Sequence, residues 1–158
     1  MILMKIDGID GTSDIKGHEK WIQCETLGWS IGRGIPTESG RTRDRTQDVV
    51  TASEIVITKR MDSSSSRLFE AAGGTEGKKV EIHFLAGAGK DAPTHAEWTL
   101  ENTLISSYSV SGDTNDAMET LALNFVKIEV KSIVKEPGDT AGSPYPVVFD
   151  RSTGVLGG

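Results

Sequence analysis

Residues 119–134 read ETLALNFVKIEVKSIV, and their pattern decides which fold the chain can adopt. With a period of two, the apolar residues fall on two opposite faces: first Leu121, Leu123 and Phe125, then Val126, Ile128 and Val130. A strand with one solvent-exposed face should instead alternate apolar and polar residues along its whole length. A β-bulge near Phe125 would flip the register and keep both sets inside. Alternatively, a second apolar face is covered by a helix or by another subunit.

Most of the remaining sequence also has the pattern of short strands. The runs with period-two alternation are residues 1–6, 20–31, 53–60, 79–86 and 96–110, with a further short strand expected near 146–150. Turn-rich pieces such as AGAGKDAPT and SGDTNDA separate these runs. Such spacing predicts a mainly β protein, a small antiparallel barrel or a sandwich.

Two of these runs predict which side chains share a face. In residues 20–31, Trp21, Leu27 and Trp29 should lie together, opposite Ile22 and Cys24. In residues 96–110, the residues expected on one face are Trp98, Leu100, Leu104, Tyr108 and Val110. Both expectations assume an unbroken period of two along each run.

One segment, about residues 63–73, predicts a short helix. Asp62 or an early serine can cap its N-terminus, and Gly73 and Gly74 end it. Within it, Leu68 and Phe69 are expected to turn inward, so that the helix covers a flank or an end of the barrel.

Length and charge limit the function classes. The chain has 158 residues, typical of one domain, and a net charge of −6, which argues against a general nucleic-acid binder. The single cysteine, Cys24, cannot form an internal disulfide and is expected to be buried. The start MILMKIDGID does not have the pattern of a Sec-type signal peptide, and no run approaches the ~20 apolar residues of a membrane-spanning helix.

Two regions have the composition of loops. Residues 32–48 are long, polar and basic, with Arg41, Arg43 and Arg45. They are either a solvated hairpin tip or an arm that orders against a neighbour. Residues 135–158 form a Pro/Gly-rich C-terminal segment that follows the domain expected at 1–134.

Motifs for catalysis or cofactor binding are weak. The glycine-rich pieces 73–79 and 86–90 lack the order and spacing of a phosphate-binding loop. His18, His83 and His95 have no metal-ligand spacing, and His83 is expected to be solvated or hydrogen-bonded. We therefore expect no enzyme activity, no metal and no cofactor. A barrel whose core is filled by three tryptophans leaves little room for a ligand, although a monomeric ligand-binding barrel remains the alternative.

Several motifs in order resemble the Hcp family, the tube protein of bacterial type VI secretion systems. The first is a D-G-I-x-G turn, the second is K-G-H-x-x-W-I and the third is G-W; their residues include Asp7, Gly8, Gly11, Lys16, Gly17, His18, Trp21, Gly28 and Trp29. ITKRMDSSSSRLFEAAGGTEGKKVEIHF resembles the family's strand–helix–strand middle, and TLENTLISSYSVSG with METLALNFVKIEV resembles its hairpin. The likeness covers most of residues 2–134 and departs in 32–48 and after 134.

The resemblance implies a β-barrel of two sheets with one flanking helix. It also implies six copies in a ring, with rings that stack into a tube. A contractile sheath propels this tube, and its other partners are a spike and a baseplate. Effectors can ride in the lumen, and the protein leaves the bacterial cytoplasm through the apparatus, for the medium or a target cell.

This resemblance suggests which residues make the contacts between copies. The second apolar face, with Val126, Ile128 and Val130, would be the seam between neighbours in the ring. Arg41, Arg43 and Arg45 would reach acidic residues of a neighbouring copy, such as Asp113 or Asp116.

Overall fold

The structure is a computed structural model that describes residues 1–34, 49–134 and 143–158. These residues form a mainly β fold with one helix, α1 (Ser65–Ala72). The strands are β1 (Ile2–Ile6), β2 (Ile22–Cys24), β3 (Thr26–Gly28), β4 (Ile31–Gly32), β5 (Thr51–Ala52), β6 (Ile55–Arg60), β7 (Lys78–Leu85), β8 (Thr94–Gly112), β9 (Ala117–Asn124), β10 (Lys127–Val134), β11 (Ser143–Asp150) and β12 (Val155–Gly157). The prediction of an antiparallel β fold with a short helix is confirmed.

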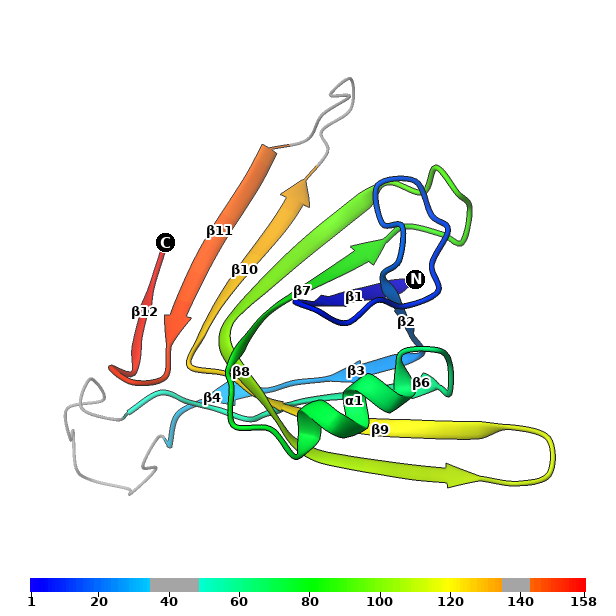
Figure 1. Ribbon diagram of the computed structural model, residues 1–158. Coiled ribbons are helices and arrows are strands. Elements are labelled where there is room, and N and C mark those ends of the chain that lie inside the picture. Colours follow the sequence, from blue (N-terminus) through cyan, green and yellow to red (C-terminus); the bar gives the residue numbers. More distant parts are fainter. Residues whose placement is uncertain (35–48, 135–142) are drawn as a thin grey trace, which may run out of the picture.

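The strands form two layers that share the long strand β8 (Figure 1). The first sheet has the order β12-β11-β10-β8-β7-β1-β2, and the second has the order β3-β6-β9-β8. The N-terminal half of β8 pairs with β7 and β10, and its C-terminal half pairs with β9. Only Glu25 separates β2 from β3, so the chain passes from one layer to the other at this corner, although β2 and β3 do not pair with each other.

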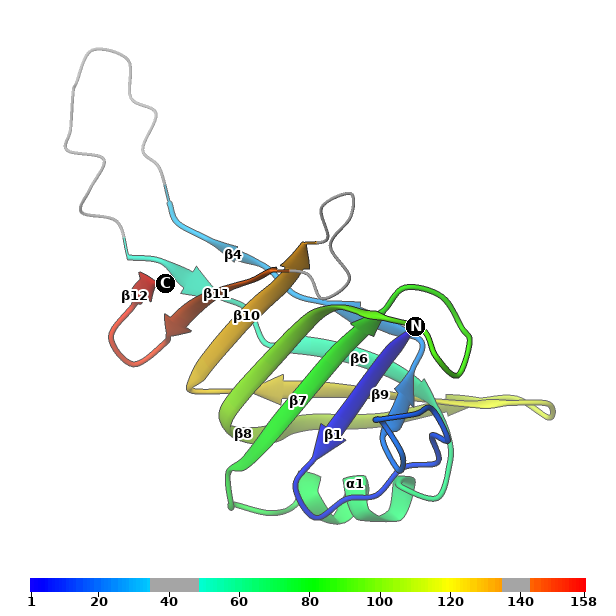
Figure 2. The same ribbon diagram turned by 90° about the horizontal axis from the view of Figure 1, so that it is seen from above.

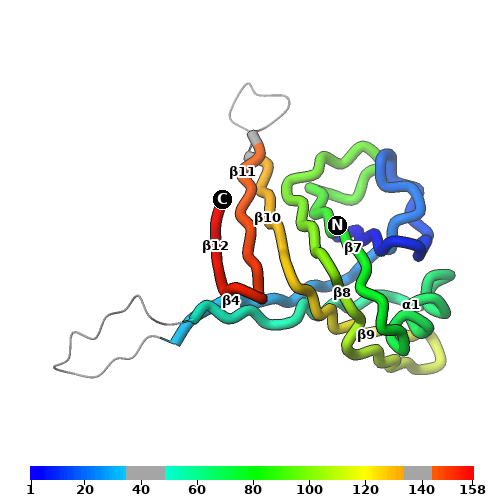
Figure 3. The backbone as a smooth tube through the Cα atoms, turned by 60° about the vertical axis from the view of Figure 1, so that its left-hand side comes forward, coloured from blue at the N-terminus to red at the C-terminus, as the bar shows by residue number. Residues whose placement is uncertain are grey.

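On the far side of β8 from β7, the first sheet continues through β10, β11 and β12 as a wing (Figure 3). β11 pairs with β10 along its whole length, and Phe149 of β11 is buried in the core. The C-terminal segment, in which we expected one strand, therefore contributes two strands to the sheet.

The stretch at 119–134 is two strands in different sheets. β9 lies in the second sheet and β10 in the first, and the chain turns between them at Phe125 and Val126. This corner explains why the buried positions shift by one residue along the stretch. Before it the odd-numbered Leu121, Leu123 and Phe125 are buried, and after it the even-numbered Ile128 is buried. The expectation that Ile128 faces outward is wrong, because the corner turns it into the same core.

In β8 the positions that face the core also shift by one residue, at the bend of the strand. Asn102 adopts a positive φ of 49°, which is uncommon for residues other than glycine. Before the bend Leu100 is buried, whereas after it Thr103 and Ile105 are buried. The prediction that Leu104 shares the face of Leu100 is therefore wrong, and Leu104 is exposed.

The tryptophans of residues 20–31 also lie on different faces. At the corner between β2 and β3 the backbone N–H of Glu25 donates to the Thr58 carbonyl, 2.8 Å away. Trp29 packs against the main core, with its ring centroid 5.4 Å from that of Trp98. Trp21 lies in a second apolar cluster instead, so the prediction that Trp21 and Trp29 share a face is wrong.

This second cluster lies on the outer face of the first sheet. It consists of Leu3, Ile15, Trp21 and Leu85, and the segment between β1 and β2 covers it. Figure 2 shows this segment folded beside β1 and β2. Part of the surplus apolar surface in the sequence is thus buried within the chain, beneath its own loop.

Helix α1 packs one side against the core and leaves the other exposed. Leu68 is fully buried, and Ala71 and Ala72 pack against the core cluster. Phe69, which was also expected to turn inward, is 69% exposed. The inward positions are three to four residues apart, as one face of a helix requires, and Phe69 falls off that face.

Candidate functional site

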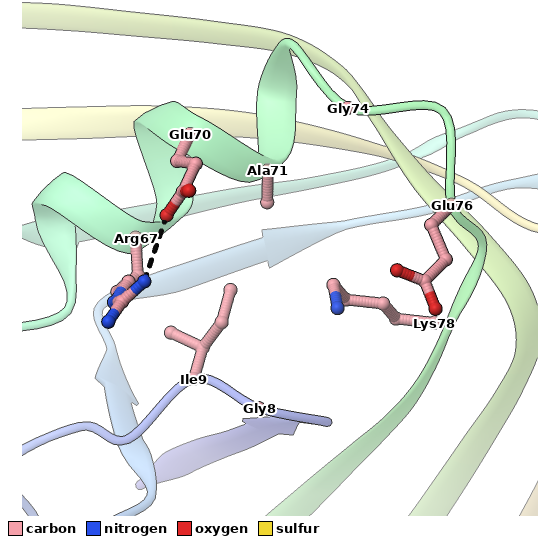
Figure 4. Close-up of a pocket in the computed structure, with 8 residues that line it drawn as sticks. All are labelled: Gly8, Ile9, Arg67, Glu70, Ala71, Gly74, Glu76 and Lys78. Atoms are coloured by element: carbon pink, nitrogen blue, oxygen red, sulfur yellow. Dashed lines mark hydrogen bonds and ion pairs between the residues drawn. The ribbon is translucent and has the colours of Figure 1, made fainter.

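One concave site in the described part of the chain lies between α1 and the turn after β1. This cleft of about 290 Å³ is lined by Gly8, Ile9, Arg67, Glu70, Ala71, Gly74, Glu76 and Lys78 (Figure 4). Arg67 donates to Glu70 across 3.1 Å, and the cleft offers two cations and two carboxylates around an apolar floor. A nucleophile hydrogen-bonded to a base, which covalent catalysis needs, is not among its lining residues.

One cavity within the described core is too small for a ligand. This cavity near the end of the core, lined by residues such as Ile6, Val80, Ile105 and Leu123, holds about 10 Å³. That is roughly the space of one water molecule.

Within residues 1–34, 49–134 and 143–158, His, Cys, Asp and Glu side chains do not gather in threes or more as a metal ion would require. In the same residues, α1 is too short and too polar to pass through a bilayer. Cys24 is buried, as expected, and burial raises the pKa of its thiol to about 12.

The outer face of the second sheet presents small, uncharged side chains. In register across the sheet, one row is Gly28, Val56, Ala122 and Ser107, and the next is Thr26, Thr58, Thr120 and Ser109. The hydroxyls of Thr26 and Thr58 are hydrogen-bonded at 2.6 Å. These two rows carry no charge over the width of the sheet.

Charged residues gather at one end of this sheet. Arg60 forms ion pairs with Asp116 at 2.6 Å and with Glu25 at 3.1 Å. Asp113 accepts hydrogen bonds from the backbone N–H groups of Asn115 and Asp116, and these bonds lower the pKa of its carboxyl. Asp116, one expected partner for a neighbour's arginine, is thus already paired within its own chain.

Two edges of the second sheet expose backbone groups. Among the residues that the structure describes, β3 pairs only with β6, and residues 104–112 of β8 pair only with β9. An unpaired edge is a template for another strand. The β8 edge is the longer of the two and carries a register shift between Ile105 and Ser107.

A groove runs beside the β8 edge. It has a volume of about 430 Å³ and lies between α1 and β8. Its lining residues are Phe69, Glu70 and Ala72 of α1, Gly73 just after it, and Ser106, Ser107 and Tyr108 of β8. The exposed Phe69 ring meets Tyr108 edge to face, with centroids 5.9 Å apart. An exposed aromatic side chain beside an open strand edge is typical of a contact surface for another protein chain.

A buried ionic network fixes α1 and this edge to the sheet. Lys59 and Glu119 are fully buried and lie 2.5 Å apart. Lys59 also donates to Asp62 at 3.0 Å, and Asp62 accepts from the Ser64 hydroxyl just before α1. Tyr108 donates to Glu119 at 2.5 Å, and burial together with this bond raises the pKa of Tyr108 to about 12.

The predicted contact residues are placed as follows. Val126 is 38% exposed at the corner, Val130 packs against the core while partly exposed, and Ile128 is buried. Val126 and Val130 therefore remain candidates for a contact, and Ile128 does not. Arg41, Arg43 and Arg45 lie outside the described residues.

The motif residues of the N-terminal segment have structural roles. Gly8 and Gly17 adopt φ values of 81° and 79°, which glycine tolerates at no steric cost. Asp7 donates its backbone N–H to Lys79, and Lys16 approaches Asp91 to 3.8 Å. Trp21 and the buried His18 belong to the covered outer face of the first sheet.

Gly11 has the strictest requirement of these motif residues. A Cβ there would lie 2.4 Å from the Trp21 carbonyl oxygen and 2.6 Å from Cα of Ile22. We expect Gly11→Ala to destabilise the fold by about 1–3 kcal/mol, because neither backbone atom can move aside. Gly28→Ala is the matched control, since no heavy atom lies within 4 Å of its Cβ position. Thermal unfolding of both variants checks this; equal midpoints would contradict it.

Sequence reasoning missed Phe69 and the β8 edge as surface features. A signal for Phe69 was present: Ser65, Leu68 and Ala72 are three and four residues apart and define the inward face without it. The β8 edge had no such signal, because the residue pattern of a strand does not show which other strands pair with it.

Comparisons with known proteins agree with this fold. A family model described as "Type VI secretion system effector, Hcp" matches residues 3–131. A search of curated proteins found no match. The fold is similar to that of a solved type six secretion system protein, with 24% identity, a TM-score of 0.86 and 98% of both chains covered.

Two further solved structures share the fold. Hcp1 from Salmonella typhimurium has 18% identity and a TM-score of 0.76, with 96% of this chain and 95% of that chain covered. A type VI secretion system effector from Yersinia pestis has 15% identity and a TM-score of 0.72, with 95% and 99% covered. Because the family model spans most of the described chain, this protein belongs to the Hcp family of type VI secretion systems.

Proposed function

We propose that this protein is a structural subunit of the type VI secretion inner tube, which forms rings of six copies that stack and are exported. The observation that carries the proposal is the second sheet, which has two edges without a strand partner among the described residues and belongs to a chain of the Hcp family. The role is mechanical, and no catalytic step is part of it.

The seam between neighbours joins these two edges. The β3 edge of one copy meets the β8 edge of the next, with Phe69 beside it. Such a contact uses two different surfaces of each copy, and a rotation of the right size closes it into a ring. Closure removes the open edges, which a free subunit would expose to aggregation. Val126 and Val130 are further candidates for contacts between copies.

The neutral face of the second sheet lines the central hole in this proposal. The first sheet and its wing add width on the opposite side of the core, as Figure 1 shows. A wedge-shaped subunit closes a ring with its narrow side toward the axis. The side chains of Thr26, Thr58 and Thr120 would then face the lumen, where effectors can be carried.

Stacking of rings is assigned to residues 32–48. We expect charge reversal at Arg41, Arg43 and Arg45 to shorten the tubes while the rings and the fold persist, because many weak contacts along a tube add by avidity. Tube lengths in electron micrographs measure this effect. Unchanged lengths would exclude these arginines from stacking, and loss of the rings would place them in the seam instead.

The expected partners are the other components of the apparatus. They are the sheath around the tube, the spike at its tip, the baseplate and any effectors in the lumen. In this proposal the protein moves from the bacterial cytoplasm to the medium or a target cell through the apparatus itself.

Negative-stain electron microscopy of the purified protein tests the proposal. We expect annular particles with six-fold symmetry, some of them stacked face to face. Compact particles of single-subunit size across the whole concentration range would contradict the tube function and favour a monomeric module.

A further inference from the structure

The segment between β1 and β2 is a loop that holds itself together. Its backbone bonds connect Gly11 to Lys20, Ser13 to Trp21, His18 to Ile15 and Lys20 to Ser13, with lengths of 2.6–3.0 Å. Residues 10–20, here called the flap, cover Leu3 and Leu85 on the outer face of the first sheet. The flap is attached to the sheet by the apolar packing of Ile15 and of Trp21, the residue that follows the flap, and by the contact of His18.

His18 contacts a second histidine on the sheet. Its Nε2 atom lies 2.8 Å from Nδ1 of His83 on β7, and both rings pack against Trp21 with centroids 4.7 and 4.5 Å away. A hydrogen bond between two imidazoles needs one N–H donor and one lone pair. It therefore exists only while at least one of the two rings is neutral.

The surroundings of His18 make double protonation costly. His18 is only 9% exposed, and its Nδ1 atom is buried without a hydrogen-bond partner among the described residues. With both rings charged, two cations would face each other at this distance, and a buried N–H would remain unpaired. Opening of the flap relieves both penalties, because it returns His18 to water.

We propose that the His18–His83 pair is a pH-sensitive latch, which keeps the flap closed while one ring is neutral and releases it when both rings are protonated. Release uncovers the apolar surface of Leu3 and Leu85 beneath the flap. The proposal rests on the geometry of this chain and not on the tube function.

Other charged groups face the pair from the surrounding elements. They are Glu19 in the flap, Lys5 on β1, Glu81 on β7, Glu97 on β8 and Lys131 on β10. Glu97 lies opposite His83 in the sheet, and its negative charge favours the protonated His83 ring. Lys131 lies 3.3 Å from the Glu97 carboxylate, and its positive charge opposes this effect. Two exposed ion pairs, Lys16–Asp91 and Lys90–Asp14, also connect the flap to the turn after β7.

The direction of the pH effect follows from His83. Burial is the largest cause that lowers the pKa of His83, and the positive charges of His18 and Lys131 add to it against the attraction of Glu97 and Glu81. The folded state therefore favours the neutral ring. The neutral His83 ring therefore stabilises the folded state above the ordinary histidine pKa of about 6.5. This stabilisation is lost as the pH falls from 6.5 toward the lower pKa that His83 has in the folded state.

Hydrogen exchange of the flap amides in the full-length protein tests the latch. After correction for intrinsic rates, we expect protection to fall about tenfold or more between roughly pH 8 and pH 5. His83→Gln keeps a side chain that can hydrogen-bond to His18 but does not titrate, so flap protection should lose most of its pH dependence. His95→Gln is the matched control, because His95 is exposed and lies outside the pair.

Two outcomes would overturn the latch: wild-type protection that does not change with pH, or a His83→Gln protein as sensitive as the wild type. Histidine ring NMR signals of the wild type provide a test that needs no variant. We expect the His18 and His83 signals to change over the same pH range as flap opening. Flap opening without any change in these signals would also overturn the proposal.

Discussion

Lys59→Met is expected to destabilise the fold by about 3–5 kcal/mol, because it leaves the buried Glu119 carboxylate without its cation. Both side chains are fully buried, and Lys59 donates to Glu119, to Asp62 and to the Arg60 carbonyl. Methionine has a similar length, so that lost packing contributes little. For a domain of this size the unfolding midpoint should fall by about 6–20 °C.

Lys131→Met is the matched control for this effect. Lys131 pairs with Glu97 at 3.3 Å, but about a third of each side chain is exposed, and such pairs contribute about 0–1 kcal/mol. A second change, Glu119→Gln on the Lys59→Met background, should restore much of the loss by removing the uncompensated charge. If Lys59→Met and Lys131→Met unfold at the same temperature, the network does not stabilise the fold as argued.

Phe69→Asp is expected to convert rings into single copies. Phe69 is 69% exposed in the isolated chain, so the substitution leaves the folded subunit intact. In the proposed seam it places a charge beside the β8 edge, where an aromatic anchor can contribute about 2 kcal/mol or more. That corresponds to roughly thirtyfold in affinity at each contact, and the loss recurs at each seam of the ring.

Phe69→Tyr controls for the loss of the aromatic ring. It keeps the edge-to-face contact with Tyr108 and should still form rings. Size-exclusion chromatography separates the two outcomes, and circular dichroism checks that both variants are folded. Rings that persist unchanged in folded Phe69→Asp protein would place the seam elsewhere on the surface.

Sequence reasoning succeeded where one local rule decides the structure. The inward residues of β6 and β7 follow a period of two, and the structure buries Ile55, Ile57, Val80 and Ile82 accordingly. The helix between them begins and ends close to its predicted limits, since the glycines at 73 and 74 stop it.

The errors in assigning strand faces occur where the chain changes sheet. At Glu25, Asn102 and Phe125 the period of two is interrupted, and each interruption moves the following side chains to the opposite face. A strand's own residues carry no sign of such a corner, because pairing with distant strands creates it. The same limit hid the open β8 edge, whereas the family resemblance came from motifs that need no knowledge of register.

The molar mass of the purified protein in solution tests the central claim most directly, namely that copies join through the edges of the second sheet. Light scattering should give a mass near six times 16.9 kDa at moderate concentration. A mass near 16.9 kDa at every concentration would contradict the ring and, with it, the tube.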